Sequence, residues 1–317
     1  MLRRDGERFL LDCGEGTQRQ LLRSGIGLVE LREVLLTHYH ADHYLGLPDM
    51  LKTFALRGRE LPLTIYGPPG LRELLESLRR IFGRLTFPVE LVEVRPGDSL
   101  DREDYRIQTF AVDHGVSAVG YALVEDTRPG RFDVEAARAL GVPEGPLWGR
   151  LQAGEPVDVA GSTVAPHQVL GPPRPARKVV FSGDTRPARS VLEAANAADL
   201  LVHEATFGIE ERDRAQETGH TSAVDAAELA RVADVRLLAL THLSNRYFGG
   251  EILREARQAV EDAGGETHVV VPRDFDIIEV RFAERGGPQL VKGGALGRAT
   301  EGGELERAAV VSAEGEQ

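Results

Sequence analysis

The chain has 317 residues and a hydrophobic content of 42%, which is enough to bury one large core or two modest ones. Its single cysteine, Cys13, excludes an intramolecular disulfide and a cysteine-built zinc site, so a bound metal would need histidine and carboxylate ligands. The net charge of −12 argues against non-specific binding to nucleic acid, and an RNA ligand would need local clusters of basic residues.

Short apolar runs rich in β-branched residues recur along the chain and predict strands. These runs are Phe9–Leu11, Val34–Thr37, Leu63–Tyr66, Val89–Val94, Ile107–Val112, Val179–Ser182, Leu200–His203, Leu237–Thr241, Val269–Val271 and Ile277–Phe282. Amphipathic patterns between them predict helices over Gly70–Ile81, Ser190–Ala197, Thr221–Val232 and Gly250–Asp262. The mixture of the two patterns predicts an α/β fold.

Two segments depart from this pattern. Between Arg128 and about Ala165, Gly and Pro are too frequent for a core element, which predicts an inserted arm. A plain surface loop is the alternative, although a structureless connection of this length is uncommon inside a compact domain. Residues 284–317 are rich in Gly and Glu and have little to bury, so they are predicted to be a disordered tail after a domain of residues 1–283.

Four potential metal ligands directly follow the strand predicted at Val34–Thr37. The segment THYHADH places three histidines and an aspartate, His38, His40, Asp42 and His43, within six positions, a density that isolated structural histidines do not reach. Imidazole nitrogen and carboxylate oxygen suit Zn²⁺, and Mn²⁺ or Fe²⁺ are alternatives because ligand type alone does not fix the metal. This loop therefore predicts a metal site, with zinc preferred.

Further ligands are expected at the ends of other strands, because one short loop cannot surround two ions. His114, Asp184 and His242 each follow an apolar run, where α/β folds commonly place their sites. We expect Asp184 to bridge two ions, although an aspartate in a turn such as SGDT is also common for structural reasons. The first ion would be held by His38, His40 and His114, and the second by Asp42, His43 and His242. Two such ions would lower the pKa of a shared water and supply a nucleophile at neutral pH.

The run HYHADH, followed by His114, Asp184 and His242 in matching order and approximate spacing, resembles the signature of the metallo-β-lactamase superfamily. The resemblance extends from about Phe9 to about Val280. It implies a four-layer αββα sandwich, with a binuclear metal site at one edge of two packed sheets.

Several further motifs resemble the ribonuclease Z family of tRNA 3′-processing endoribonucleases. They are LLDCGEGTQRQL, HYHADHYLGLPDML, IYGPPG, VDHGV, FSGDTRP, HEATF, GHTSA and THLSNRY. The resemblance implies that Glu204 orients His220, which protonates the departing oxygen, and that Asp42 accepts a proton and positions the attacking water. It also implies that Arg246 meets a phosphate. Taken singly, Glu204, His220 and Arg246 also have ordinary structural interpretations, and it is the metal set beside them that favours the functional ones.

The segment GVPEGPLWGRLQAGE resembles the flexible exosite arm of the same family, which clamps the tRNA elbow, usually in the other subunit of a homodimer. Such an arm would reconcile the acidic net charge with an RNA substrate through local charge, backbone and shape contacts. Its arginines are Arg128, Arg131, Arg138 and Arg150, partly offset by Asp133, Glu135 and Glu144. Family members usually carry an additional strand and an Arg-Asn loop ahead of the segment corresponding to Glu7–Cys13. We therefore expect either a truncated start or a protein without this edge strand.

Together with the metal-ligand pattern, the resemblance implies an endoribonuclease with two Zn²⁺ per chain that cleaves precursor tRNA 3′ of the discriminator nucleotide and leaves a 3′-hydroxyl. We expect a homodimer with neither a DNA nor a membrane partner. No apolar run approaches the roughly 18 residues that span a bilayer, and the start lacks a signal-peptide pattern, so a cytoplasmic location is expected. One alternative is a superfamily hydrolase of small phosphodiesters, sulfate esters or lactones, and another is a non-catalytic RNA-binding protein. The HEATF, GHTSA and arm motifs argue against the first, and the intact ligand set argues against the second.

Overall fold

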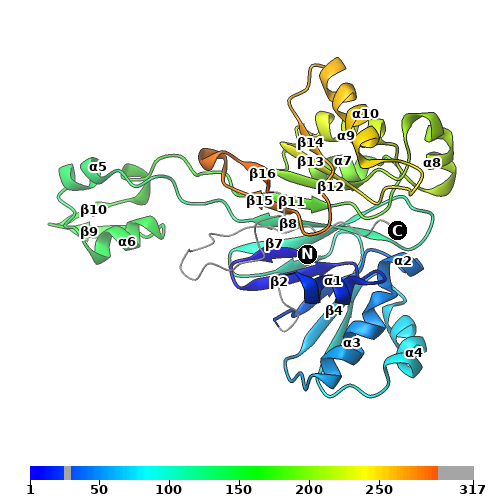
Figure 1. The fold of residues 1–317 in the computed structure, drawn as a ribbon. Helices are drawn as coiled ribbons and strands as arrows, with labels where there is room; N and C mark the ends of the chain where they lie inside the picture. Colours follow the sequence, from blue (N-terminus) through cyan, green and yellow to red (C-terminus); the bar gives the residue numbers. More distant parts are fainter. Residues whose placement is uncertain (25–29, 292–317) are drawn as a thin grey trace. The chain divides into compact units, whose positions relative to one another are not determined.

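The computed structural model describes residues 1–24 and 30–291, and the chain divides into two compact units (Figure 1). The first unit comprises Met1–Arg102, Arg106–Val124 and the chain from Arg177 onward. The second comprises Glu103–Tyr105 and Glu125–Ala176. Within the described ranges, no helix combines the length and the apolar character that a bilayer crossing requires.

The first sheet lies in the N-terminal part of the larger unit and has five strands. In spatial order they are β1 (Leu2–Arg4), β2 (Glu7–Leu11), β3 (Glu33–Leu35), β4 (Leu63–Gly67) and β5 (Val89–Glu93). Strand β1 pairs antiparallel with β2, and β2 to β5 run parallel. The connecting helices are α1 (Thr17–Arg23), α2 (Ala41–Tyr44), α3 (Gly46–Leu56) and α4 (Leu71–Phe82). Leu21, Leu51 and Leu75 from three of these helices join the core on one face of this sheet.

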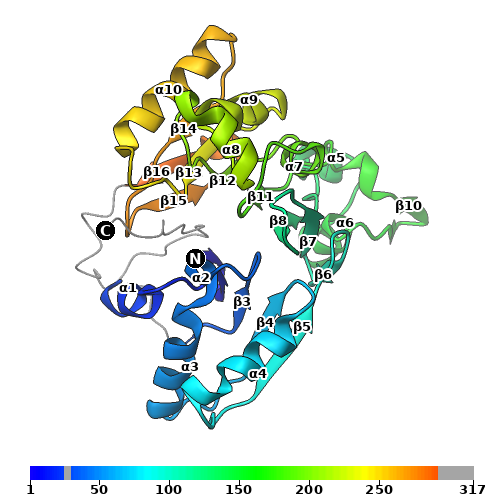
Figure 2. The same ribbon diagram turned by 90° about the vertical axis from the view of Figure 1, so that its right-hand side faces the viewer.

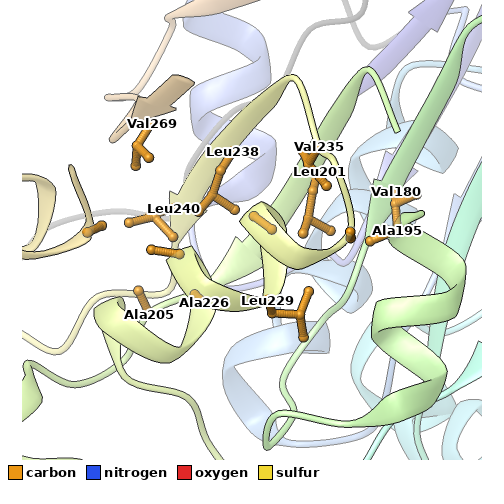
Figure 3. Packing of buried hydrophobic residues seen from close by; sticks show 14 of the residues in the cluster. Val180, Ala195, Leu201, Ala205, Ala226, Leu229, Val235, Leu238, Leu240 and Val269 are labelled. Atoms are coloured by element: carbon orange, nitrogen blue, oxygen red, sulfur yellow. The ribbon is translucent and has the colours of Figure 1, made fainter. Parts of the chain in front are cut away.

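The second sheet has seven strands. In spatial order they are β14 (His268–Val270), β13 (Leu237–Thr241), β12 (Leu200–Glu204), β11 (Lys178–Phe181), β8 (Val119–Glu125), β7 (Tyr105–Ala111) and β6 (Ser99–Asp101). Strands β11 to β14 run parallel, whereas β8 runs antiparallel to β11. Helices α7 (Arg189–Ala195), α9 (Ala223–Val232) and α10 (Gly249–Asp262) contribute to the core on one face of this sheet. Figure 3 shows residues of this core, among them Leu201 and Leu238 of the sheet and Leu229 of α9.

The two sheets pack against each other through their uncovered faces. The Tyr121 hydroxyl on β8 donates to the Leu36 carbonyl after β3 at 2.8 Å, and Val119 N donates to Thr37 O at 2.9 Å. In Figures 1 and 2, helices α1, α3 and α4 lie on the side of the first sheet, and α7, α9 and α10 on the side of the second. This is the four-layer αββα sandwich that the sequence predicted.

Part of the segment predicted to be disordered is folded. Part of the segment assigned to the disordered tail forms a 3-10 turn, η3 (Ala283–Arg285), and strand β16 (Pro288–Val291). This strand pairs antiparallel with β15 (Ile277–Val280), so the prediction of disorder from residue 284 was wrong for residues 284–291. The turn between the strands uses Gly286 and Gly287, whose φ angles of 100° and 72° favour glycine. Residues 292–317 lie outside the described part of the chain.

The second unit has a small core of its own. Its elements are α5 (Val134–Ala139), α6 (Pro146–Gln152), β9 (Val157–Val159), β10 (Ser162–Val164) and the 3-10 turn η1 (Pro166–Gln168). Six buried apolar residues form the core, namely Ala137, Val142, Leu151, Val157, Val164 and Val169. The expectation that this segment holds no core element was therefore wrong. Its Gly and Pro residues sit at the ends of short elements, as Gly145 and Pro146 do at the start of α6.

Candidate metal centre

The potential ligands lie where strands end. His38 follows β3, His114 follows β7, Asp184 follows β11, Glu204 ends β12 and His242 follows β13. Carboxyl ends of parallel strands meet at one edge of a sheet, and the packing of the two sheets brings both edges together. The approach is close at Gly183, where a Cβ atom would come within 2.9 Å of Thr37 Cβ. The fold thus gathers polar side chains from both sheets.

Asp184 is the centre of this gathering. Its side chain is only 4% exposed, and Oδ2 faces ring nitrogens of five histidines. The distances from Oδ2 are 3.3 Å to His43 Nε2, 3.4 Å to His242 Nε2, 3.8 Å to His114 Nε2, 3.8 Å to His220 Nδ1 and 3.9 Å to His38 Nε2. A buried carboxylate surrounded by this many imidazoles is the donor chemistry of a zinc-type site.

One group of donor atoms consists of His38, His40 and His114. His40 Nδ1 lies 3.0 Å from His38 Nε2 and 2.9 Å from His114 Nε2. The three donor atoms of the group all lie within 4.8 Å of one another. Nitrogens about 2.1 Å from a tetrahedral ion would be about 3.4 Å apart, so this spacing fits a single metal ion.

A second group consists of Asp42, His43 and His242. Asp42 Oδ2 lies 3.3 Å from His242 Nε2 and 3.7 Å from His43 Nε2, and all three donor atoms again lie within 4.8 Å of one another. These two groups are the sets that the sequence assigned to two ions, and Asp184 lies beside both. The structure therefore brings the seven predicted ligands together.

Two polar residues outside the predicted set orient the first histidines. Asp12 Oδ2 accepts a hydrogen bond from His43 Nδ1 at 2.8 Å, and the Thr37 hydroxyl donates to the same Asp12 oxygen at 2.9 Å. That hydroxyl is then free to accept from His38 Nδ1, 3.0 Å away. With both Nδ1 atoms held, His38 and His43 present Nε2 to the cluster. His43 Nε2 is buried and has no hydrogen-bond partner among the described residues, as expected of a metal ligand.

His114 and His242 are held in the same way. Gly219 O accepts from His114 Nδ1 at 2.8 Å, and Thr206 Oγ1 lies 2.9 Å from His242 Nδ1. The Thr206 hydroxyl donates to Glu204 at 2.6 Å, so its oxygen accepts from His242. Each ring therefore points Nε2 toward Asp184. With the proton on Nδ1, Nε2 is left unprotonated, as a metal ligand requires. The donor atoms of the cluster therefore fit a metal ion in their type, their spacing and their orientation.

Burial and neighbouring charges in the cluster shift several pKa values. Burial opposes the ionisation of Asp184, but His242 and His43 hold the pKa of its carboxyl far below the ordinary range. Burial likewise opposes protonation of His43, yet Asp12 and Asp184 raise its pKa to about 12. Burial and the neighbouring His43 lower the pKa of His38 to about 2. A ligating imidazole must be neutral, so metal binding would displace protons from this cluster. Metal binding would therefore weaken as the pH falls.

Asp12 gives a prediction that separates orientation from ligation. Asp12→Asn removes the charge that holds His43 Nδ1 but keeps a residue tolerant of the positive φ of 55°. We expect metal affinity to fall by about 10- to 100-fold, measured by competition with a zinc-binding dye. Asp5→Asn is the matched control, because Asp5 also has a positive φ, of 52°, and belongs to no donor group among the described residues. Equal affinities in the two variants would contradict the orienting role of Asp12.

Glu204 and His220 form a second polar centre beside the cluster. Glu204 Oε1 lies 2.9 Å from His220 Nδ1 and accepts from Thr185 N at 2.8 Å, and Oε2 accepts from Thr221 N at 3.1 Å. With its side chain 1% exposed, the carboxylate is fixed and fully hydrogen-bonded. His220 Nε2 has no hydrogen-bond partner in the described ranges, so this nitrogen is available for other chemistry. His220 also falls in a donor group with His114 and Asp184, and the geometry alone permits a ligand role too.

Arg246 lies in the loop that follows β13, apart from these donor groups. Its side chain is 42% exposed, and Nη1 forms an ion pair with Glu211 at 2.9 Å. Its Nε donates to Ser244 Oγ at 3.3 Å. Arg246 was predicted from the sequence, whereas Glu211, Asp12, Thr37 and Thr206 were not. Of these, Asp12 carried a usable signal, because it directly follows a predicted strand as the other ligands do.

The αββα sandwich with its histidine and aspartate cluster has the fold and site of a metallo-β-lactamase superfamily protein, and residues 1–242 match the family model described as the metallo-beta-lactamase superfamily. Ribonuclease Z of Myxococcus xanthus is 50% identical over 254 residues, which cover 79% of this chain and 82% of that protein. Ribonuclease Z of Methanosarcina acetivorans is 42% identical over 285 residues, covering 89% of this chain and 92% of that protein. The chain therefore belongs to the ribonuclease Z family.

A solved structure agrees with this membership. The crystal structure of the short form of human tRNase Z is 27% identical and superposes with a TM-score of 0.56, covering 77% of this chain and 85% of that chain. The family resemblance drawn from the sequence is thus confirmed, and so is the enzyme class, a ribonuclease-type phosphodiester hydrolase.

Proposed function

We propose that the protein is a zinc-dependent endoribonuclease that cleaves precursor tRNA just 3′ of the discriminator nucleotide and leaves a 3′-hydroxyl. The observation that carries the proposal is the buried Asp184 carboxylate, which lies 3.3–3.9 Å from nitrogens of five histidines in a member of the ribonuclease Z family. The names of the relatives, ribonuclease Z and tRNase Z, support precursor tRNA as the substrate.

Two Zn²⁺ per chain fit the donor set. His38, His40 and His114 would hold one ion, Asp42, His43 and His242 the other, and Asp184 would be shared. When bound, the ions supply positive charge for the phosphoryl oxygens and a water of lowered pKa at neutral pH. The protein contributes ligands whose orientation is already fixed by Asp12, Thr37, Gly219 and Thr206.

Asp42 positions the attacking water and accepts its proton in this proposal. Its side chain is 61% exposed, the most accessible of the acidic groups at the cluster, so substrate and solvent can reach it. The hydrogen bond from His242 keeps the pKa of Asp42 below the ordinary carboxyl range. The carboxylate of Asp42 is therefore both ionised and accessible, as a proton acceptor must be.

His220 donates a proton to the departing oxygen. Glu204 holds the Nδ1 atom of His220, which leaves Nε2 as the nitrogen that exchanges the proton. Because Glu204 is itself fixed by three Thr residues, the ring orientation does not depend on substrate. Arg246 then meets a phosphate of the bound strand with the donors that Glu211 does not use.

The unit of residues 125–176 acts as the tRNA-binding exosite, and the active form is a homodimer. Two of its arginines form ion pairs within the unit, Arg138 with Glu135 and Glu144, and Arg150 with Glu155. Binding there would rest on backbone and shape contacts as well as charge, which fits an RNA helix and gives no reason for DNA binding. The cytoplasm is the compartment in which we place this reaction.

This role of the second unit can be tested by deletion. Arg128 and Arg174 form an antiparallel bridge with hydrogen bonds of 3.1 and 2.9 Å, so a short Gly-Ser linker can replace residues 129–173. We expect the precursor tRNA concentration at half-saturation to rise at least about tenfold. The rate of bis(4-nitrophenyl) phosphate hydrolysis should stay within about twofold of that of the unmodified protein. Equal loss on both substrates would make the unit structural rather than a binding element.

The decisive experiment is single-turnover cleavage of an end-labelled precursor tRNA, with chelator and with zinc added back, and with the cut mapped to the nucleotide. A zinc-dependent cut after the discriminator is expected. A folded, zinc-loaded protein that leaves tRNA intact but hydrolyses small phosphodiesters, sulfate esters or lactones would overturn the proposal.

A further inference from the structure

A compact aromatic and ionic cluster lies next to His220 and is not used by the mechanism above. At its base is Phe207, which is 4% exposed and whose ring centroid lies 6.1 Å from that of His220. Two guanidinium groups contact the same ring, with Cζ of Arg246 5.4 Å and Cζ of Arg214 5.9 Å from its centroid. The ring therefore supports two cations beside the proposed proton donor.

Glu211 joins the two cations. Its Oε1 accepts from Arg246 Nη1 at 2.9 Å and lies 3.3 Å from Arg214 Nη1, and its Oε2 accepts from the Tyr247 hydroxyl. The Tyr247 hydrogen bond and the two guanidinium groups lower the pKa of Glu211, so the carboxylate stays ionised. Three elements are thereby tied together, namely η2 (Ile209–Glu211), α8 (Arg212–Thr218) and the loop after β13.

The two arginines of the cluster keep N–H donors that no protein group uses within the described ranges. The two guanidinium groups share the carboxylate of Glu211, and the carboxylate of Glu210 lies beside Tyr247 on the other side of the cluster. Each guanidinium has five N–H donors, and Nη2 of Arg214 and of Arg246 makes no hydrogen bond within the described ranges. The two side chains are 54% and 42% exposed, so a ligand can reach them.

We propose that Arg214 and Arg246, held on Phe207 by Glu211, form a subsite that binds a second phosphate of the RNA strand, next to the scissile one. Paired guanidinium groups suit phosphate oxygens because their planar donors match the anion's geometry. A single arginine would bind one phosphate, whereas a tethered pair also fixes the direction of the strand across His220. This proposal rests on the proposed function and adds Arg214 as a binding residue and Glu211 as a positioning residue.

The test measures half-saturation and the rate constant at saturation separately, in single-turnover cleavage of precursor tRNA by the zinc-loaded protein. For Arg214→Ala, the concentration that gives half-saturation should rise about five- to twentyfold, and the rate constant at saturation should fall much less. The slope of log affinity against log salt concentration should become shallower by about 0.7. Arg214→Lys should recover the salt slope but only part of the affinity, because it keeps the charge and loses the planar donors. Arg79→Ala is the matched control, since Arg79 makes a similar exposed ion pair with Glu76 at 3.5 Å.

Glu211→Gln separates positioning from simple electrostatics. It removes a negative charge, so electrostatics alone predicts tighter RNA binding, whereas loss of the tether predicts a severalfold rise in half-saturation. Tighter binding by Glu211→Gln would overturn the positioning role, and unchanged half-saturation and salt slope in Arg214→Ala would overturn the subsite. If the unmodified protein fails to cleave precursor tRNA at all, the proposed function fails first, and this result is visible before any variant is compared.

Discussion

Asp184→Ala should remove bound metal and cleavage activity together. Asp184 Oδ2 lies between the two donor groups, at 3.4 Å from His242 Nε2 and 3.9 Å from His38 Nε2, so its loss takes a ligand from both. We expect metal content near zero and a cleavage rate reduced by at least about 10³-fold, the size of several kcal/mol of lost charge stabilisation.

The measurement pairs metal analysis of the purified protein with single-turnover cleavage of precursor tRNA. Asp49→Ala is the control, because Asp49 is an exposed aspartate on α3 that belongs to no donor group among the described residues. Circular dichroism would show that both variants are folded. An Asp184→Ala protein that keeps two ions per chain would refute the shared-ligand role, whatever its activity.

The cluster of potential metal ligands could be predicted because its residues follow a simple positional rule. His38, His114, Asp184 and His242 each end an apolar run, and the carboxyl ends of strands meet in space. The same rule would have identified Asp12. It could not identify Thr206 or the Gly219 carbonyl, because a single threonine or a backbone oxygen carries no signal until the fold brings it to a histidine.

The fold was predictable to a similar extent and for similar reasons. Long apolar runs such as Leu237–Thr241 are strands because both faces are buried. The seven-residue strand β8 was missed although it is mostly buried, since its run VGYALVE directly follows a loop and is interrupted by Gly120. Gly120 is needed there, because a Cβ atom would come within 2.2 Å of the Phe110 ring. Strand β16 and the core of residues 125–176 depend on pairing and small apolar contacts, which composition does not reveal.

His220→Ala should spare metal and slow cleavage of RNA. His220 is the one histidine at the cluster whose Nδ1 is held by a carboxylate that also accepts from three Thr residues, and its Nε2 has no described partner. A residue that supplies a proton in the transition state contributes about 10²- to 10⁴-fold, and we expect a loss of this size in the single-turnover rate constant. Metal content should stay at the level of the unmodified protein.

Substrate choice makes this prediction specific to proton transfer. The leaving group of RNA cleavage is a ribose alkoxide, whose hydroxyl has a high pKa, so it needs a proton to depart. The 4-nitrophenolate leaving group departs readily without a proton. His220→Ala should therefore slow hydrolysis of bis(4-nitrophenyl) phosphate by less than about tenfold, far less than it slows RNA cleavage. Glu204→Gln, which keeps an acceptor oxygen 2.9 Å from Nδ1 but loses the charge, should show the same pattern to a smaller degree. If His220→Ala instead lowers the rate equally on both substrates and also loses metal, His220 is a metal ligand. Its position in one donor group with His114 and Asp184 permits that role.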